Sequence, residues 1–115
     1  MKGGTEMERR RFGQVGRLKP EKRDEYVRLH AAVWPDVLKM ITACNLENYS
    51  IFIRGNVVFS YFEYTGTDYE ADMAKMAADE TTQRWWRCTR PCFEVYDEAC
   101  VEAFYTDMDS IFYLK

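Results

Sequence analysis

Two periods of hydrophobicity run along this chain, and the points where one replaces the other divide it into predicted helices and strands. Apolar residues recur every three or four positions, as on one face of an amphipathic helix, over 20–33, 35–44, 68–79 and 82–90. Pro20 and Pro35 stand in the first turns of the first two helices, where the missing N–H costs nothing. Pro35 also disfavours helical geometry at the residue before it, and Pro91 ends the last helix.

A period of two replaces the helical period in the middle of the chain. Large side chains alternate over 49–54 and, most clearly, over 57–64, which predicts two strands. Only Gly55 and Asn56 separate them, and a glycine at the first central position suits a type II′ turn. These two segments should therefore form a β-hairpin.

The two ends of the chain carry weaker patterns. Residues 11–18 are interrupted by two glycines and predict a weak strand, and the short apolar run 111–114 predicts a closing strand. Between the last helix and that run, residues 92–109 have no clear period, and the part over 98–105 fits either a helical turn or a loop. We expect residues 1–8 to be a flexible lead-in and 9–115 to form one domain.

The predicted order is strand, helix, strand, strand, helix, strand, which is the ferredoxin-like (split βαβ) pattern of an α+β sandwich. This arrangement places helices on one face of the sheet. The hairpin nevertheless has large side chains on both faces: Tyr49, Ile51 and Ile53 opposite Phe52, and Phe59 and Tyr61 opposite Phe62 and Tyr64. A second face of this kind needs cover, so we expect a homodimer whose two sheets pack face to face as a dimeric α+β barrel.

Charge and composition exclude several classes of function. The net charge is −3 and the clustered basic residues are confined to 9–11, which argues against nucleic acid as a partner. No apolar run reaches the roughly 18 residues of a membrane span, and no segment of signal-peptide type begins the chain, so we expect a soluble cytoplasmic protein. The four cysteines include no CxxC pair and the chain has one histidine, so we expect free thiols and no metal site.

Aromatic residues make up 16% of the chain, whereas histidine occurs only once. His30 follows Tyr26 by four positions, so the two side chains are neighbours on one helix face. The histidine fits either a buried structural role or proton transfer, because imidazole titrates near neutral pH. Trp85 and Trp86 point about 100° apart on a helix, and they fit either core packing or a flat platform for the apolar side of a sugar.

Four segments in series resemble the L-rhamnose mutarotase family. They are DEYVRLHAAVWPDV at 24–37, NYSIF at 48–52, TTQRWW at 81–86 and IFYL at 111–114, and the resemblance spans about 11–114. Each motif alone is weak, but their order and number are specific. The resemblance implies a ferredoxin-like dimer that interconverts the α and β anomers of L-rhamnose, a monosaccharide, with no cofactor.

The same resemblance implies roles for individual residues. The acid histidine of the family matches His30, its helix tyrosine matches Tyr26, its strand tyrosine matches Tyr49, and its paired tryptophans match Trp85 and Trp86. Opening a pyranose ring needs a proton on the ring oxygen and the loss of one from the anomeric hydroxyl, which one histidine can supply and recover. The tyrosines would hold hydroxyls or relay protons, and the tryptophans would bind the apolar side of the sugar.

The segment 87–109 departs from the family pattern, since it is more aromatic than the proline- and aspartate-rich loop that the family has there. This leaves the sugar open, with L-fucose or another deoxy sugar as an alternative to L-rhamnose. Other readings are a small monooxygenase or haem-handling protein on the same dimeric barrel, with His30 as axial ligand, a sugar-binding module without catalysis, and a structural dimer.

Overall fold

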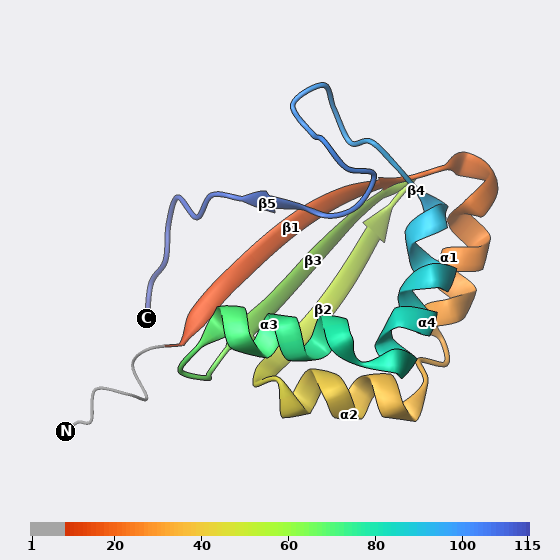
Figure 1. Ribbon diagram of the computed structural model, residues 1–115. Helices are drawn as coiled ribbons and strands as arrows, with labels where there is room; N and C mark the ends of the chain where they lie inside the picture. Colours follow the sequence, from red (N-terminus) through yellow and green to blue (C-terminus); the bar gives the residue numbers. More distant parts are fainter. Residues whose placement is uncertain (1–8) are drawn as a thin grey trace.

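A computed structural model describes residues 9–115, and the lead-in predicted at 1–8 lies outside the described residues. Over this range, one antiparallel sheet has the order β2-β3-β1-β4, with β5 also paired to β1 (Figure 1). This is the strand order of a ferredoxin-like α+β fold, in which the last strand is split in two. The strands are β1 (Arg10–Leu18), β2 (Leu46–Arg54), β3 (Val57–Tyr64), β4 (Phe93–Glu94) and β5 (Thr106–Met108).

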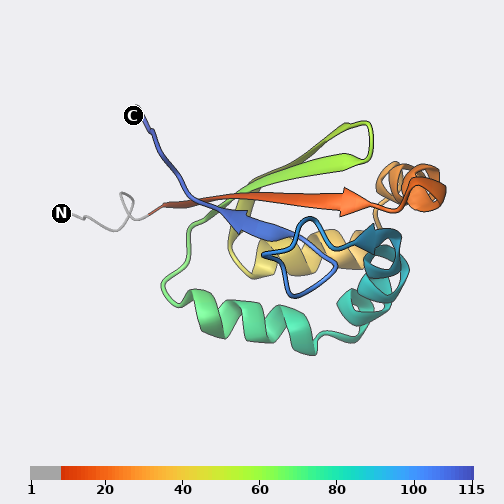
Figure 2. The same ribbon diagram turned by 90° about the horizontal axis from the view of Figure 1, so that it is seen from above.

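The helices lie on one side of the curled sheet, with α1 near the end of β1, as the view from above shows (Figure 2). They are η2 (Pro20–Lys22), α1 (Arg23–His30), α2 (Pro35–Ala43), α3 (Tyr69–Ala78), α4 (Glu80–Thr89) and η3 (Arg90–Cys92). The predicted break before Pro35 is confirmed, since Trp34 is extended and Pro35 opens α2. The carboxylates of Asp68 and Asp79 accept hydrogen bonds from the free N–H groups that begin α3 and α4.

The predicted hairpin is confirmed, with the central residues of β2 and β3 paired directly. Gly55 has a φ of +59° while Asn56 is not in the left-handed region, as a type II′ turn requires. β2 begins earlier than predicted, at Leu46, because a bulge between Glu47 and Ser50 breaks the alternation of side chains there. Asn48, inside the bulge, has a φ of +51°.

The closing strand predicted at 111–114 is wrong. The preceding segment β5 pairs with β1 instead. Its Asp107 lies opposite Gln14 and accepts a hydrogen bond from the Gln14 side-chain amide at 2.7 Å. Residues 111–114 form no strand, and Ile111 is 96% exposed. An apolar run becomes a strand only beside a partner strand, and on this edge β1 pairs with β5 at Gly13–Val15 and with β4 at Arg17 and Leu18. Residues 98–105, for which the sequence fits either a helical turn or a loop, form a loop.

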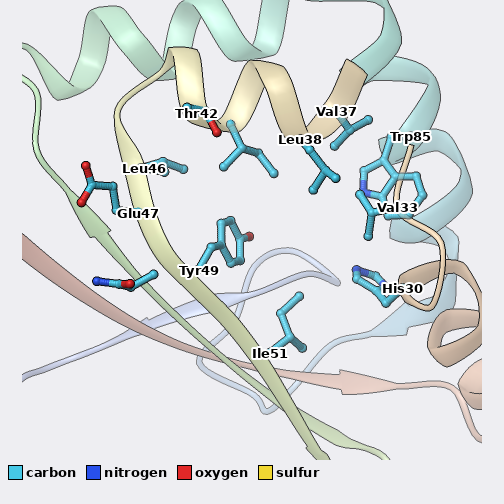
Figure 3. A pocket seen from close by; sticks show the side chains of 12 residues that line it. His30, Val33, Val37, Leu38, Thr42, Leu46, Glu47, Tyr49, Ile51 and Trp85 are labelled. Atoms are coloured by element: carbon cyan, nitrogen blue, oxygen red, sulfur yellow. The ribbon is translucent and has the colours of Figure 1, made fainter. Parts of the chain in front are cut away.

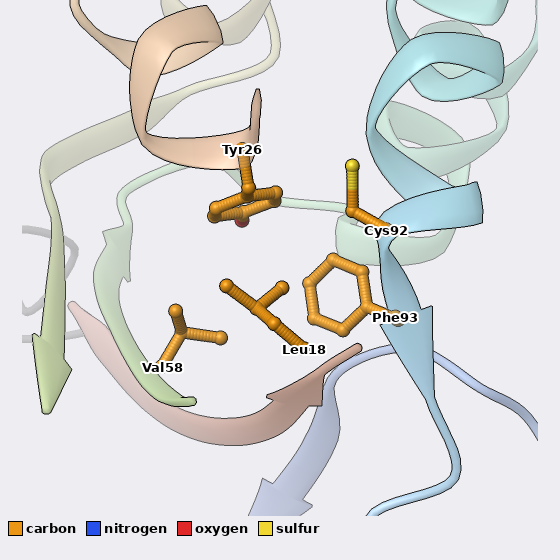
Figure 4. Close-up of a cluster of buried hydrophobic side chains, with 5 residues drawn as sticks. All are labelled: Leu18, Tyr26, Val58, Cys92 and Phe93. Atoms are coloured by element: carbon orange, nitrogen blue, oxygen red, sulfur yellow. The ribbon is translucent and has the colours of Figure 1, made fainter. Parts of the chain in front are cut away.

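Two groups of buried side chains form the core between sheet and helices. One joins Leu18, Tyr26, Val58, Cys92 and Phe93 (Figure 4), and the other joins Cys44, Leu46, Phe62, Tyr64 and Met76. Gly16 makes the first group possible, because a Cβ there would come within 2.6 Å of the Phe93 ring. All four cysteines are free in the structure. In residues 9–115 no helix is both long and apolar enough to span a bilayer.

Candidate active site

A cavity of about 670 Å³ opens between α1, α2, α4 and β2 (Figure 3). Its walls are mainly apolar side chains of α2, among them Val37, Leu38 and Ile41. Polar groups enter it from α1 and β2, and Figure 3 shows His30 and Tyr49 directed into the space between them. A mostly apolar cavity with a few convergent polar groups is the usual form of a small-molecule site.

His30 occupies the last turn of α1, and its ring is fixed by the helix itself. Its Nδ1 lies 2.9 Å from the backbone oxygen of Tyr26, one helical turn earlier. A carbonyl oxygen can only accept, so Nδ1–H donates and the neutral ring keeps a lone pair on Nε2. Burial lowers the pKa of His30 below its usual 6.5, although the hydrogen bond to Tyr26 opposes the shift. The imidazole is therefore neutral at neutral pH.

Tyr26 lies behind His30 and outside the lining of the cavity. It is only 4% exposed, and its ring lies 4.3 Å from the His30 ring. Its hydroxyl is 2.9 Å from the hydroxyl of Tyr105, which comes from the loop before β5. Burial raises the pKa of both phenols well above the ordinary value, so both stay protonated at neutral pH.

Tyr49 reaches the cavity because of the bulge in β2. The positive φ at Asn48 interrupts the strand alternation immediately before it and re-aims the tyrosine. Its ring packs against Phe62 on the helix-covered face of the sheet, with ring centroids 5.2 Å apart. Burial of the hydroxyl raises the pKa of Tyr49, and the neighbouring Ser60 hydroxyl opposes this in part. Tyr49 therefore enters the site as a neutral hydrogen-bond donor.

The two tryptophans of α4 share a second, smaller cavity, and of the two only Trp85 also lines the larger one. Trp85 is 6% exposed and lies edge-on between His30 and Trp34, with centroid distances of 5.3 and 5.2 Å. Trp86 lines this smaller cavity, which has a volume of about 170 Å³, and the Arg90 guanidinium lies 4.4 Å from the Trp86 ring. The larger cavity thus joins His30, Tyr49 and Trp85, while the smaller one joins Tyr49 to both tryptophans.

Sequence reasoning missed three residues of this region. Trp34 supports Trp85, and the Trp-Pro pair at the start of α2 was a usable signal for it. Gln14 and Tyr105 both line the smaller cavity. They come from a glycine-rich strand and a segment without clear periodicity, so no local pattern marked them. Within residues 9–115, no group of three or more histidine, cysteine or acidic side chains is placed to hold a metal ion.

Comparisons with known proteins place the chain in one family. A family model described as L-rhamnose mutarotase matches residues 11–114. An L-rhamnose mutarotase of Oceanobacillus iheyensis is 30% identical over 108 residues, which cover 91% of this chain and 98% of the relative. One of Bacillus subtilis is 30% identical over 96 residues, covering 82% of this chain and 88% of the relative.

The fold comparison agrees with the sequence comparison. The crystal structure of an L-rhamnose mutarotase from Formosa agariphila superimposes with a TM-score of 0.69 at 19% identity, covering 92% of this chain and 99% of that one. A conserved protein of Methanosarcina mazei has the same fold with a TM-score of 0.56 at 13% identity, covering 76% of this chain and 84% of that one. The chain, whose match to the family model spans nearly its whole described length, belongs to the L-rhamnose mutarotase family.

Proposed function

We propose that this protein interconverts the α and β anomers of L-rhamnose, and that His30 carries the proton transfers. Membership of the family supports the reaction. The observation that carries the assignment of His30 is its neutral ring at the wall of the larger cavity, with Nδ1 bound to Tyr26 and Nε2 left for substrate. Mutarotation breaks the bond between C1 and the ring oxygen O5, rotates about C1–C2 and re-forms the ring, with proton transfers at O1 and O5 that one imidazole can carry.

The neutral imidazole sets the order of events. His30 Nε2 first accepts the proton of the anomeric hydroxyl O1, the bond between C1 and the ring oxygen O5 breaks, and O5 receives the proton from His30. Because O1 and O5 are bonded to the same carbon, one nitrogen can serve both. The open aldehyde turns about C1–C2, and the reverse steps close the ring with O1 on the other side. His30 thus accepts before it donates, which reverses the order expected from the sequence, where the histidine supplies the first proton and then recovers it.

The aromatic residues hold the sugar in this scheme. Tyr49 donates a hydrogen bond to a sugar oxygen in the larger cavity, since its raised pKa keeps it protonated. Trp85 and Trp86 contact the apolar side of the ring. Tyr26 acts on the sugar only indirectly, because its buried hydroxyl contacts the Tyr105 hydroxyl and faces neither cavity. Positioning of this kind adds to the proton transfer.

We further propose that the protein is a cytoplasmic homodimer. The sheet face without helices exposes 62% of Phe52 and 37% of Phe59, whose rings lie 6.4 Å apart. A second copy would cover this face and complete the dimeric α+β barrel expected from the sequence. Four free thiols are typical of a reducing compartment.

Saturation-transfer NMR on L-rhamnose tests the proposed reaction. The native protein should accelerate anomer exchange, and more strongly for L-rhamnose than for L-fucose or D-glucose. His30→Gln should lower the catalysed rate about 10²- to 10⁴-fold, the usual contribution of a general acid–base group. His30→Gln with an unchanged circular dichroism spectrum and undiminished exchange would refute the role of His30.

The alternatives from the sequence make different predictions in the same experiments. Preference for L-fucose would show as faster exchange of that sugar, and a binding module would bind L-rhamnose without accelerating exchange. A haem-handling protein would show a Soret band after incubation with haem. Family membership favours none of these alternatives.

A further inference from the structure

The smaller cavity is a second compartment of the same site. It shares Tyr49 and Trp85 with the larger cavity, and it extends away from His30 toward β1 and the loop before β5. A monosaccharide with its anomeric carbon at His30 must place its other ring positions further along the site. The inference below rests on the proposed function and concerns what meets the sugar in this second compartment.

Tyr105 contributes a donor to this compartment. Tyr26 is buried, and among the described residues the only partner of its hydroxyl is the Tyr105 hydroxyl at 2.9 Å. Either hydroxyl can be the donor of this bond, and we assign the donation to Tyr26, because its side chain is the more deeply buried and its hydroxyl has no other partner among the described residues. The hydrogen of Tyr105 is then left over, and this ring lines the smaller cavity.

Gln14 contributes an acceptor to the same compartment. Its Nε2 donates to the Asp107 carboxylate at 2.7 Å, which identifies the remaining amide atom as the oxygen Oε1. Within residues 9–115 that oxygen has no protein partner. Gln14 lies on the helix-covered face of β1, directly opposite Ser60 of β3, and it lines the smaller cavity with Tyr105.

The pairing of β5 with β1 holds the two groups on one wall. Gln14 pairs with Asp107, and Tyr105 stands two residues before Asp107. The Tyr105 ring packs edge-on against Phe93, with ring centroids 5.1 Å apart. One donor and one acceptor on the same wall match a single hydroxyl group, which both accepts and donates.

We propose that Gln14 and Tyr105 bind one ring hydroxyl of the sugar remote from the anomeric carbon, with Tyr105 donating to it and Gln14 Oε1 accepting from it. The two residues determine sugar specificity, because a sugar without that hydroxyl leaves both groups unpaired. Neither residue takes part in the proton transfers at His30.

Anomer-exchange kinetics on L-rhamnose and its 2-, 3- and 4-deoxy derivatives test this pair. The native enzyme should discriminate against one of the three deoxy sugars. Tyr105→Phe should raise the KM for L-rhamnose about five- to tenfold, the effect of one lost neutral hydrogen bond, with kcat changed less than about twofold. Gln14→Leu should behave alike, and both variants should lose discrimination against the same deoxy sugar.

Tyr96→Phe is the matched control, since it removes a phenol from the same loop but outside both cavities. It should leave KM and the discrimination pattern unchanged. Unchanged KM in Tyr105→Phe, or full discrimination retained against all three deoxy sugars, would overturn the inference while leaving the proposed function intact. A native protein that accelerates no L-rhamnose exchange would overturn both.

Discussion

The two faces of the sheet carry similar aromatic side chains but differ in how their polar groups are paired. On the helix-covered face the Ser60 hydroxyl is fully buried and makes no hydrogen bond of ordinary geometry among the described residues, although it neighbours the Tyr49 hydroxyl. On the open face, Glu63 accepts hydrogen bonds from Tyr61 at 2.7 Å, Asn48 at 3.0 Å and Arg9 at 2.6 Å. Within residues 9–115, the one buried side-chain oxygen that lacks a hydrogen-bond partner therefore lies on the side of the sheet that carries the cavities.

Burial follows the same division along β3. Val58, Phe62 and Tyr64 are at most 4% exposed, while Phe59 on the other face is 37% exposed. Hydrophobicity alone does not separate the two sets, because both alternate with a period of two. The covered face builds the core and the site, and the open face is the surface that we propose a second copy covers.

Removing one aromatic ring from each face gives the largest expected contrast. Phe62→Ala should lower the free energy of unfolding by about 3–5 kcal/mol, because it leaves a cavity beneath the helices. Phe59→Ala should cost less, and its cost should grow with protein concentration if the dimer buries that ring. Urea unfolding at two protein concentrations measures both, and equal, concentration-independent losses would contradict the distinction.

A charge on the open face should separate the proposed dimer. Phe52→Lys should weaken association by about a hundredfold or more, since a lysine facing an apolar interface would be buried without a partner. Light scattering after size exclusion should then report a monomer at micromolar concentration. Val101→Lys is the control, because Val101 is 96% exposed and lies outside the sheet. If the native protein is a monomer, or if the Phe52→Lys variant remains a dimer, the proposed assembly is contradicted.

Acidification should begin to lower stability at a different pH on each side of the sheet. The pKa of His30 is lowered from 6.5 chiefly by burial, and the pKa of Glu63 is lowered from 4.5 chiefly by its hydrogen bond from Tyr61. A lowered pKa in the folded protein means stability that is present above the unfolded value and is lost as pH falls. The His30 contribution should therefore decline below pH 6.5, and that of Glu63 only below 4.5.

Unfolding free energies between pH 7 and 3 check this order. His30→Gln should remove the first decline and Glu63→Gln the second. Catalysed anomer exchange should also fall with the protonation of His30, starting below pH 6.5. A rate that rises through this range after subtraction of solvent catalysis would contradict the neutral starting state of the imidazole.

The smallest effect is expected at Ser60. An unpartnered buried hydroxyl is itself unfavourable, so Ser60→Ala should leave the free energy of unfolding unchanged or raise it by up to about 1 kcal/mol. The same urea titration measures it. A loss larger than 1 kcal/mol would mean that the hydroxyl is paired in the folded protein.

Local physical rules account for what the sequence determined. Proline and glycine placed the break before α2 and the turn of the hairpin, and four-residue spacing put Tyr26 beside His30. Period-two alternation placed Phe62 and Phe59 on opposite faces of the sheet, without deciding which face the helices cover. These features depend on neighbours within a few positions, so the residues themselves carry the information.

Only the tertiary structure decided the features that join distant segments. The apolar run 111–114 looked like the closing strand, but hydrogen bonding to β1 selected Thr106–Met108. That choice brings Tyr105, 79 positions away in sequence, onto the Tyr26 hydroxyl. The lowered pKa of His30 likewise comes from burial among several elements. Strand partners and desolvation are set by packing between segments, which no local pattern of residues expresses.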